Sequence, residues 1–82
     1  MIDKMRLYFE QEYQRAKKLD EREEEKRVKD PFYEGLGTFD IYNDSISRLY
    51  AVATFAMSCG ANTVETELLY DEYSKKLWRI LD

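Results

Sequence analysis

The stretch FAMSCGANTVETELLYDEY, residues 55–73, decides how this chain folds. Ala56 is followed four positions later by Gly60 and then by a new amphipathic run, which outlines either a helix-turn-helix DNA reader or the corner of a helical hairpin. Gly60 is well placed just past the end of a helix, and Asn62 precedes Glu65 by the spacing of a helix-starting cap. A connection this short brings the next helix back antiparallel, or at a steep angle, to the one before it.

The DNA-reading interpretation fits the residue pattern and the charge less well. A helix-turn-helix favours an aliphatic residue about six positions beyond the glycine, and Thr66 stands there. The first turns of the second helix would have to enter the major groove between phosphates, yet they are acidic. Because phosphate contacts supply most non-specific affinity, we favour the hairpin and expect no direct binding of nucleic acid. The acidic side chains are Glu65, Glu67, Asp71 and Glu72.

Outward from this corner, apolar residues recur three and four positions apart, which places them on one face of a helix. The pattern predicts one helix over about 41–59 and another over about 64–81. The same spacing predicts a first helix over about 2–29, which ends at Asp30 because Pro31 disfavours the α conformation there. We therefore expect a single all-α domain, a three-helix bundle with a hairpin of its second and third helices.

The first helix is expected to extend beyond the hydrophobic core of the bundle. Its apolar stripe ends at Leu19, and the next positions on the stripe are Asp20, Glu23 and Arg27. We expect this charged part to be solvated; the alternatives are an intermolecular helix pair or a lever that reaches a partner. The segment 30–40 contains the proline, two glycines and three aromatic residues, so we expect a loop that folds back over the end of the bundle.

Several side chains of the second helix carry expectations of their own. Thr38, Asp40 or Asn43 is available as its N-cap. Cys59 lies on the apolar side at the helix end and is expected to be a small buried residue. Phe55 falls near the polar side, so we expect its ring to be partly exposed.

The net charge of −4 hides an uneven distribution. Residues 1–29 carry nine basic and eight acidic side chains, and residues 75–82 carry three basic and one acidic. Residues 30–74 carry eight acidic side chains against Arg48 alone, a net charge of −7. The middle of the chain is therefore an anion, which favours a partner with a basic surface.

Catalytic, metal and cofactor chemistry is not expected. The chain has no histidine and one cysteine, which leaves no disulfide framework, zinc-ligand spacing or Cys–His pair. Carboxylate pairs such as Glu67 with Asp71, and Glu23 with Glu25, are expected on solvated helix faces. No run reaches the ~20 apolar residues of a membrane span, and the N-terminal residues do not read as a secretory signal, so we expect a cytoplasmic protein.

Seven tyrosines are many for a core alone, because a buried phenol needs a partner for its hydroxyl. Most of them, Tyr50 included, fall on or beside core stripes, where the rings can line the bundle while the hydroxyls reach its edge. Others can form an interface, where tyrosine is enriched. We expect a partner to bind acidic residues of the third helix and the loop together with aromatic residues of the loop and the second helix. These are Glu65, Glu67, Asp71, Glu72, Glu34, Tyr33, Phe32 and Phe55.

The segment RLYAVATFAMSCGANTVETELLYDEYSKKLWRIL, residues 48–81, resembles small uncharacterised helical proteins encoded by phages and other mobile elements of Gram-positive bacteria. In these a short apolar helix ends in a glycine and is followed by an acidic, tyrosine-containing helix. The opening MRLYFEQEYQRAKKLDE, residues 5–21, is similar to their start. The resemblance implies a compact inhibitor or adaptor of host machinery, a class that includes blockers of nucleic-acid-guided defence nucleases.

Together these features predict a non-enzymatic protein-binding module that occupies a basic site on a host protein. If that site normally holds nucleic acid, the module acts as a nucleic-acid mimic. One alternative is a small helix-turn-helix-like transcriptional regulator that places Lys75, Lys76 and Arg79 against phosphates. Another is a self-associating structural protein, a homodimer through Val64, Leu68 and Trp78.

Overall fold

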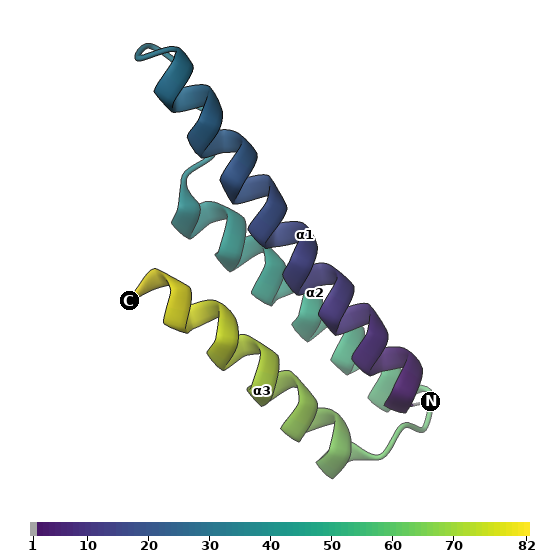
Figure 1. The fold of residues 1–82 in the computed structure, drawn as a ribbon. Helices are drawn as coiled ribbons and strands as arrows, with labels where there is room; N and C mark the ends of the chain where they lie inside the picture. The colour runs from purple at the N-terminus through teal and green to yellow at the C-terminus, as the bar shows by residue number, and fades with distance from the viewer. Residues whose placement is uncertain (1) are drawn as a thin grey trace.

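In a computed structural model that describes residues 2–82, the chain forms three α-helices (Figure 1). α1 spans Ile2–Lys29, α2 spans Thr38–Ser58 and α3 spans Thr63–Leu81. No strand is present in this part of the chain. The expected all-α three-helix bundle with a long first helix is confirmed. None of the helices within residues 2–82 combines the length and the apolar content that crossing a membrane requires.

α2 and α3 run side by side in opposite directions (Figure 1). At the corner Gly60 has a φ of 98°, and the Ala61 N–H donates to the Ala56 carbonyl at 3.0 Å. Asn62 then caps α3, because its Oδ1 accepts the Glu65 N–H at 2.9 Å. A helix-turn-helix crosses its two helices at about 90–120°. The corner in residues 55–73 is therefore that of a helical hairpin.

The core lies along a seam where all three helices meet. Phe9 of α1 is at its centre, fully buried, and its ring meets the Tyr73 ring edge-on with centroids 5.9 Å apart. Burying each large apolar side chain contributes about 1.5–3 kcal/mol, which holds α1 onto the α2–α3 hairpin. The buried apolar residues are Met5, Phe9, Ala16, Ile41, Tyr42, Ile46, Leu49, Ala53, Leu69, Tyr73 and Leu77.

The end of α1 extends past the core, and the loop of residues 30–37 returns along it to α2 (Figure 1). The apolar stripe of α1 is continued there by Asp20, Glu23 and Arg27, and all three bind the loop or the start of α2. The Thr38 hydroxyl, for example, donates to Asp20 Oδ1 at 2.7 Å. The expectation that Glu23 is solvated is wrong, since its exposed fraction is 5%.

α2 begins three residues earlier than predicted, at Thr38, so the loop is shorter than the predicted segment 30–40. The prediction that Thr38, Asp40 or Asn43 is the N-cap is wrong. Gly37 occupies that position, with φ −75° and ψ 154° and no side-chain cap bond. The start of α2 is fixed instead by the contact between Thr38 and α1, which no local pattern in the sequence indicates.

Two further expectations for α2 are wrong and one is confirmed. Cys59 is exposed, because it follows the last helical residue with φ −92° and ψ 8° and so leaves the buried face. Tyr50 is 61% exposed, since it lies at the edge of the apolar arc, where Tyr70 of α3 covers its ring only in part. Phe55 is 70% exposed, as its position near the polar side predicts.

Candidate interaction surfaces

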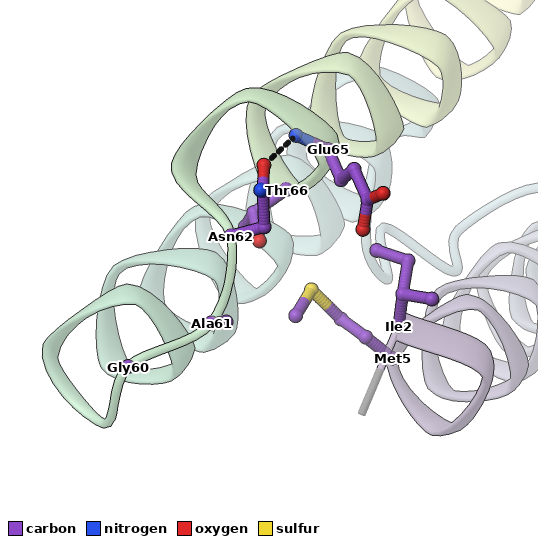
Figure 2. Close-up of a pocket in the computed structure, with 7 residues that line it drawn as sticks. All are labelled: Ile2, Met5, Gly60, Ala61, Asn62, Glu65 and Thr66. Carbon is purple, nitrogen blue, oxygen red and sulfur yellow. Dashed lines mark hydrogen bonds between the residues drawn. The ribbon is translucent and has the colours of Figure 1, made fainter.

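Two of the acidic residues expected to bind a partner, Glu65 and Glu72, lie on the side of α3 that faces α1. Glu72 Oε2 accepts a hydrogen bond from Arg6 Nη1 at 3.1 Å, and both side chains of this ion pair are exposed. Glu65 borders a pocket of about 240 Å³ next to the first turn of α1 (Figure 2). The Thr66 hydroxyl at this pocket is buried and has no hydrogen-bond partner within residues 2–82. The pocket is lined by Ile2, Met5, Gly60, Ala61, Asn62, Glu65 and Thr66.

The other two acidic residues, Glu67 and Asp71, lie on a different side of α3. Glu67 follows Glu65 by two residues, which turns it about 200° around the helix axis. Asp71 Oδ2 forms an ion pair with Lys75 Nζ at 2.8 Å. Glu67 is exposed and has no ion-pair partner among the described residues. The four carboxylates expected to bind a partner are therefore divided between two sides of α3.

Two aromatic pairs bridge α2 and α3. The Tyr50 and Tyr70 rings meet edge-on, with centroids 5.8 Å apart and an interplanar angle of 69°. The Phe39 and Trp78 rings are 6.1 Å apart and tilted by 54°. Phe39, Tyr50 and Trp78 remain 56%, 61% and 42% exposed. We call the surface formed by Phe39, Tyr50, Tyr70, Trp78 and the pocket beside them the α2–α3 face.

The α2–α3 face points away from α1. Ser45 of α2 faces α1, where its hydroxyl donates to a glutamate oxygen at 3.1 Å. Tyr50 follows Ser45 by five residues, which turns it about 140° around the helix axis. Tyr73 of α3 likewise donates to a glutamate of α1 at 2.7 Å, and Trp78 follows Tyr73 by the same interval. Tyr50 and Trp78 are therefore both turned from α1 towards solvent.

A pocket of about 250 Å³ lies beside the Tyr50–Tyr70 pair. The half-buried Met57 gives it an adaptable apolar wall, because the thioether chain is flexible and polarizable. The exposed Glu67 supplies its carboxylate. A pocket of this kind suits an apolar side chain that lies next to a cation. Its lining residues are Tyr50, Ala53, Thr54, Met57, Glu67 and Tyr70.

A second surface is built where the loop is clamped onto α1. The Tyr33 hydroxyl donates to Glu23 Oε2 at 2.7 Å, and the Arg27 guanidinium donates to the Leu36 carbonyl. The hydrogen bond from Tyr33 lowers the pKa of Glu23 and outweighs the partial burial that raises it. Gly35 has a φ of 56°, and a Cβ there would collide with Glu23 and with the Tyr33 ring. The loop therefore packs against the Glu23 carboxylate, and the glycine at position 35 leaves the space that this contact requires.

The clamped loop displays apolar side chains at the far end of α1. Phe32 is 93% exposed, and Val28 of α1 and Leu36 of the loop are exposed as well. The Asp30 carboxylate accepts the Phe32 N–H at 3.0 Å, which orders the turn. Glu34 is exposed on the same loop. The predicted loop residues thus share one place, but that place is the end of α1 beyond the core, apart from the pocket that Tyr50 and Tyr70 line within α2 and α3.

The predicted partner-binding residues therefore do not form one site. Phe55 follows Tyr50 by five residues and points about 140° away from it, off the α2–α3 face. Tyr50, Tyr70 and Met57 were missed as site residues because they lie at the edge of apolar stripes. The sequence contained one signal for this site, because the two helices carry more apolar residues than one neighbouring helix can cover. The homodimer predicted through Val64, Leu68 and Trp78, all three of them exposed, stays a prediction.

The basic residues of α3 are partly engaged within the molecule. Lys75 pairs with Asp71, and the Lys76 ammonium lies 4.6 Å from the centre of the Tyr73 ring.

Within residues 2–82 no three His, Cys, Asp or Glu side chains gather in a way that could hold a metal ion. No protein-family model, curated protein or solved structure matches the chain. What the molecule binds is therefore inferred from its own surfaces.

Proposed function

We propose that this protein is a non-enzymatic binding module whose α2–α3 face binds a basic surface of another protein. The observation that carries the proposal is the Tyr50–Tyr70 pair, which borders an apolar pocket next to the carboxylate of Glu67. Exposed tyrosine and tryptophan supply large contact areas and are enriched among residues that dominate binding energy. The carboxylate favours a cationic neighbour for the side chain that fills the pocket.

The charge of the whole chain supports a basic partner. Of residues 30–74, Arg48 is the one basic residue, and Asp44 Oδ2 accepts its Nε–H at 3.0 Å. Arg48 therefore does not neutralise the α2–α3 face. A surface of one sign steers an oppositely charged partner and makes association faster at low salt. Binding is expected to weaken as salt screens these charges, over a Debye length of ~10 Å at 0.1 M.

In its narrower form, the proposal makes the partner a host protein whose basic site normally holds nucleic acid. The resemblance of residues 48–81 to small proteins of phages and mobile elements supports such a host target. Carboxylates would then stand in for phosphates. Among the carboxylates of α3, Glu67 is the one that lines the pocket of the α2–α3 face, whereas Glu72 is paired with Arg6 of α1 and Asp71 with Lys75.

Capture of proteins from an extract of the native host cell tests the proposal. The tagged protein is expected to retain a salt-sensitive partner that the double variant Tyr50→Ala/Glu67→Lys loses. The matched double variant Phe55→Ala/Glu25→Lys also replaces an aromatic residue by alanine and a glutamate by lysine, at exposed positions elsewhere, and is expected to retain the partner. Circular dichroism checks that each variant keeps its helices.

Loss of the partner in both double variants, or in neither, would contradict a role for the α2–α3 face. Mimicry is tested on the captured protein by competition. Single- or double-stranded nucleic acid is expected to displace the module from its partner at low salt. If nucleic acid and the module bind together, the carboxylates do not replace phosphates, and the broader binding proposal stands without the mimicry.

A further inference from the structure

We infer that the segment of the partner held by the α2–α3 face is a basic amphipathic helix, which lies along this face, over the pocket and both aromatic pairs, as a fourth helix of the bundle. The inference rests on the proposed function and narrows it to one kind of occupant. The α2–α3 hairpin has two sides that another helix can cover. α1 covers one through Phe9 and Tyr73, and the other carries the two exposed aromatic pairs.

The spacing of the aromatic pairs matches the repeat of a helix. Phe39 and Tyr50 are eleven residues apart on α2, which is about 16 Å at 1.5 Å per residue. Tyr70 and Trp78 are eight residues apart on α3, about 12 Å by the same rise. Apolar anchors seven to eleven residues apart on one face of a docked helix span roughly 10–16 Å and so reach both pairs. A single short loop could occupy only one of them.

The pocket beside Tyr50 can bind one of these apolar anchors. Its volume of about 250 Å³ lies between the two hairpin helices, with Ala53 and Met57 on one side and Tyr70 on the other. A leucine or phenylalanine from a docked helix would fill it. Glu67 then lies within reach of positions one turn before or after this anchor, where lysine or arginine would stand.

Charge selects a basic helix over a second copy of this chain. Glu67 lines the pocket without an ion-pair partner in the part of the chain that the structure describes. Arg48, the basic residue of α2, lies instead towards α1, 3.9 Å from Glu12. A two-fold dimer through the α2–α3 face would bring the Glu67 carboxylates of both copies into one interface, where like charges repel. A lysine- or arginine-bearing helix meets no such repulsion.

Trp78 makes the inference testable, because it is the single tryptophan of the chain and lies in the α2–α3 face. The probe is a synthetic helix of about 18 residues with leucine at heptad spacing, lysine on its flanks and no aromatic residue. On titration we expect the Trp78 emission to move to shorter wavelength as the ring leaves water. A matched peptide with glutamate in place of each lysine is expected to cause no shift.

Variants locate the binding on the α2–α3 face. Tyr50→Ala and Glu67→Lys each remove an exposed side chain, so the core stays intact, and each is expected to weaken peptide binding about tenfold or more. Phe55→Ala removes an exposed aromatic from another side of α2 and is expected to leave binding unchanged. Equal shifts with the lysine and glutamate peptides, or equal affinities in the three variants, would overturn the inference.

Two further outcomes separate this inference from the proposed function. If a host protein is captured through Tyr50 and Glu67 but the lysine peptide never shifts Trp78, the helical occupant is wrong and the binding function stands. If Trp78 emission and the scattering mass both change with protein concentration in the absence of peptide, the occupant is a second copy and the inference is overturned. Failure of capture and of peptide binding together removes both proposals.

Discussion

The Glu12 carboxylate lies in the contact between α1 and α2, where it is 6% exposed. It accepts a hydrogen bond from Arg15 at 2.5 Å and one from Ser45 at 3.1 Å, and Arg48 lies 3.9 Å away. Burial by itself raises the pKa of Glu12, but these bonds and the positive charges outweigh burial, so the pKa is lowered. An acidic residue therefore occupies a core position because Arg15 and Ser45 donate hydrogen bonds to its carboxylate.

We expect Glu12 to contribute to acid sensitivity. Its pKa is lower in the folded state, so its stabilisation is present above the unfolded pKa of about 4.3 and is lost as the pH falls through the folded pKa. Glu12→Gln is expected to lower the free energy of unfolding at pH 7 by about 1–3 kcal/mol and to flatten its fall below about pH 5. Urea unfolding at a series of pH values measures both. Glu21→Gln, at an exposed position of α1, is the control, and an unchanged acid limb in Glu12→Gln would contradict the assignment.

A second residue-scale prediction concerns the Thr66 hydroxyl, which is buried without a hydrogen-bond partner in residues 2–82. Thr66→Val keeps the shape of the side chain and removes the unsatisfied group, so we expect the free energy of unfolding to rise by about 1 kcal/mol. The melting temperature should then rise by roughly 4–8 °C. Thr54→Val, at an exposed position of α2, is expected to change it little. A less stable Thr66→Val protein would mean that the hydroxyl is satisfied in solution, by water in the pocket of Figure 2.

At the scale of elements, the two ends of α1 hold the molecule together by different chemistry. The first half packs apolar side chains such as Met5 and Phe9 into the core. The second half continues the same stripe with Asp20, Glu23 and Arg27, which bind the loop and the start of α2 by hydrogen bonds. The stripe could be read from the sequence as far as its apolar part. Its polar continuation was not recognised because charged residues on a helix are more often solvated.

The loop clamp predicts a difference between two neighbouring glycines. Gly35→Ala places a Cβ against Glu23 and the Tyr33 ring, at a φ of 56° that non-glycine residues rarely adopt. We expect it to release the loop, seen as faster hydrogen exchange and protease cleavage within residues 30–37, while α2 and α3 stay protected. In Gly37→Ala the nearest heavy atom to the new Cβ is Asp40 Oδ2, at 3.6 Å, so that variant should behave as the parent. Equal protection of the loop in both variants would show that Glu23 does not clamp it.

At the scale of the whole molecule, the bundle is elongated, with principal extents of 48, 21 and 16 Å. Three helices can bury one seam, but each retains a side that no neighbour covers. On the α2–α3 hairpin that side is the α2–α3 face, and beyond the core it is the loop tip with Phe32. Each helix carries more apolar side chains than its two neighbouring helices can cover. The candidate binding surfaces are the apolar residues that remain exposed for this reason.

The sequence by itself determined the helices and the corner between α2 and α3. Gly60 admits a positive φ, Asn62 caps the next helix, and Pro31 restricts the residue before it. Each of these effects acts on backbone groups a few residues away, so a local pattern is sufficient to predict it. The three-residue spacing of apolar side chains is equally local, and it predicted the all-α class.

Only the tertiary structure decided which side of each helix is covered. Glu23 is buried because a loop ten residues later returns to it, and Tyr50 is exposed because α1 packs against the other side of α2. The spacing of the acidic residues places them on two sides of α3, but only the tertiary structure decides that Glu72 meets Arg6 while Glu67 lines the pocket beside Tyr50 and Tyr70. Burial and pairing depend on contacts between segments far apart in the chain, and periodicity along one helix does not contain them.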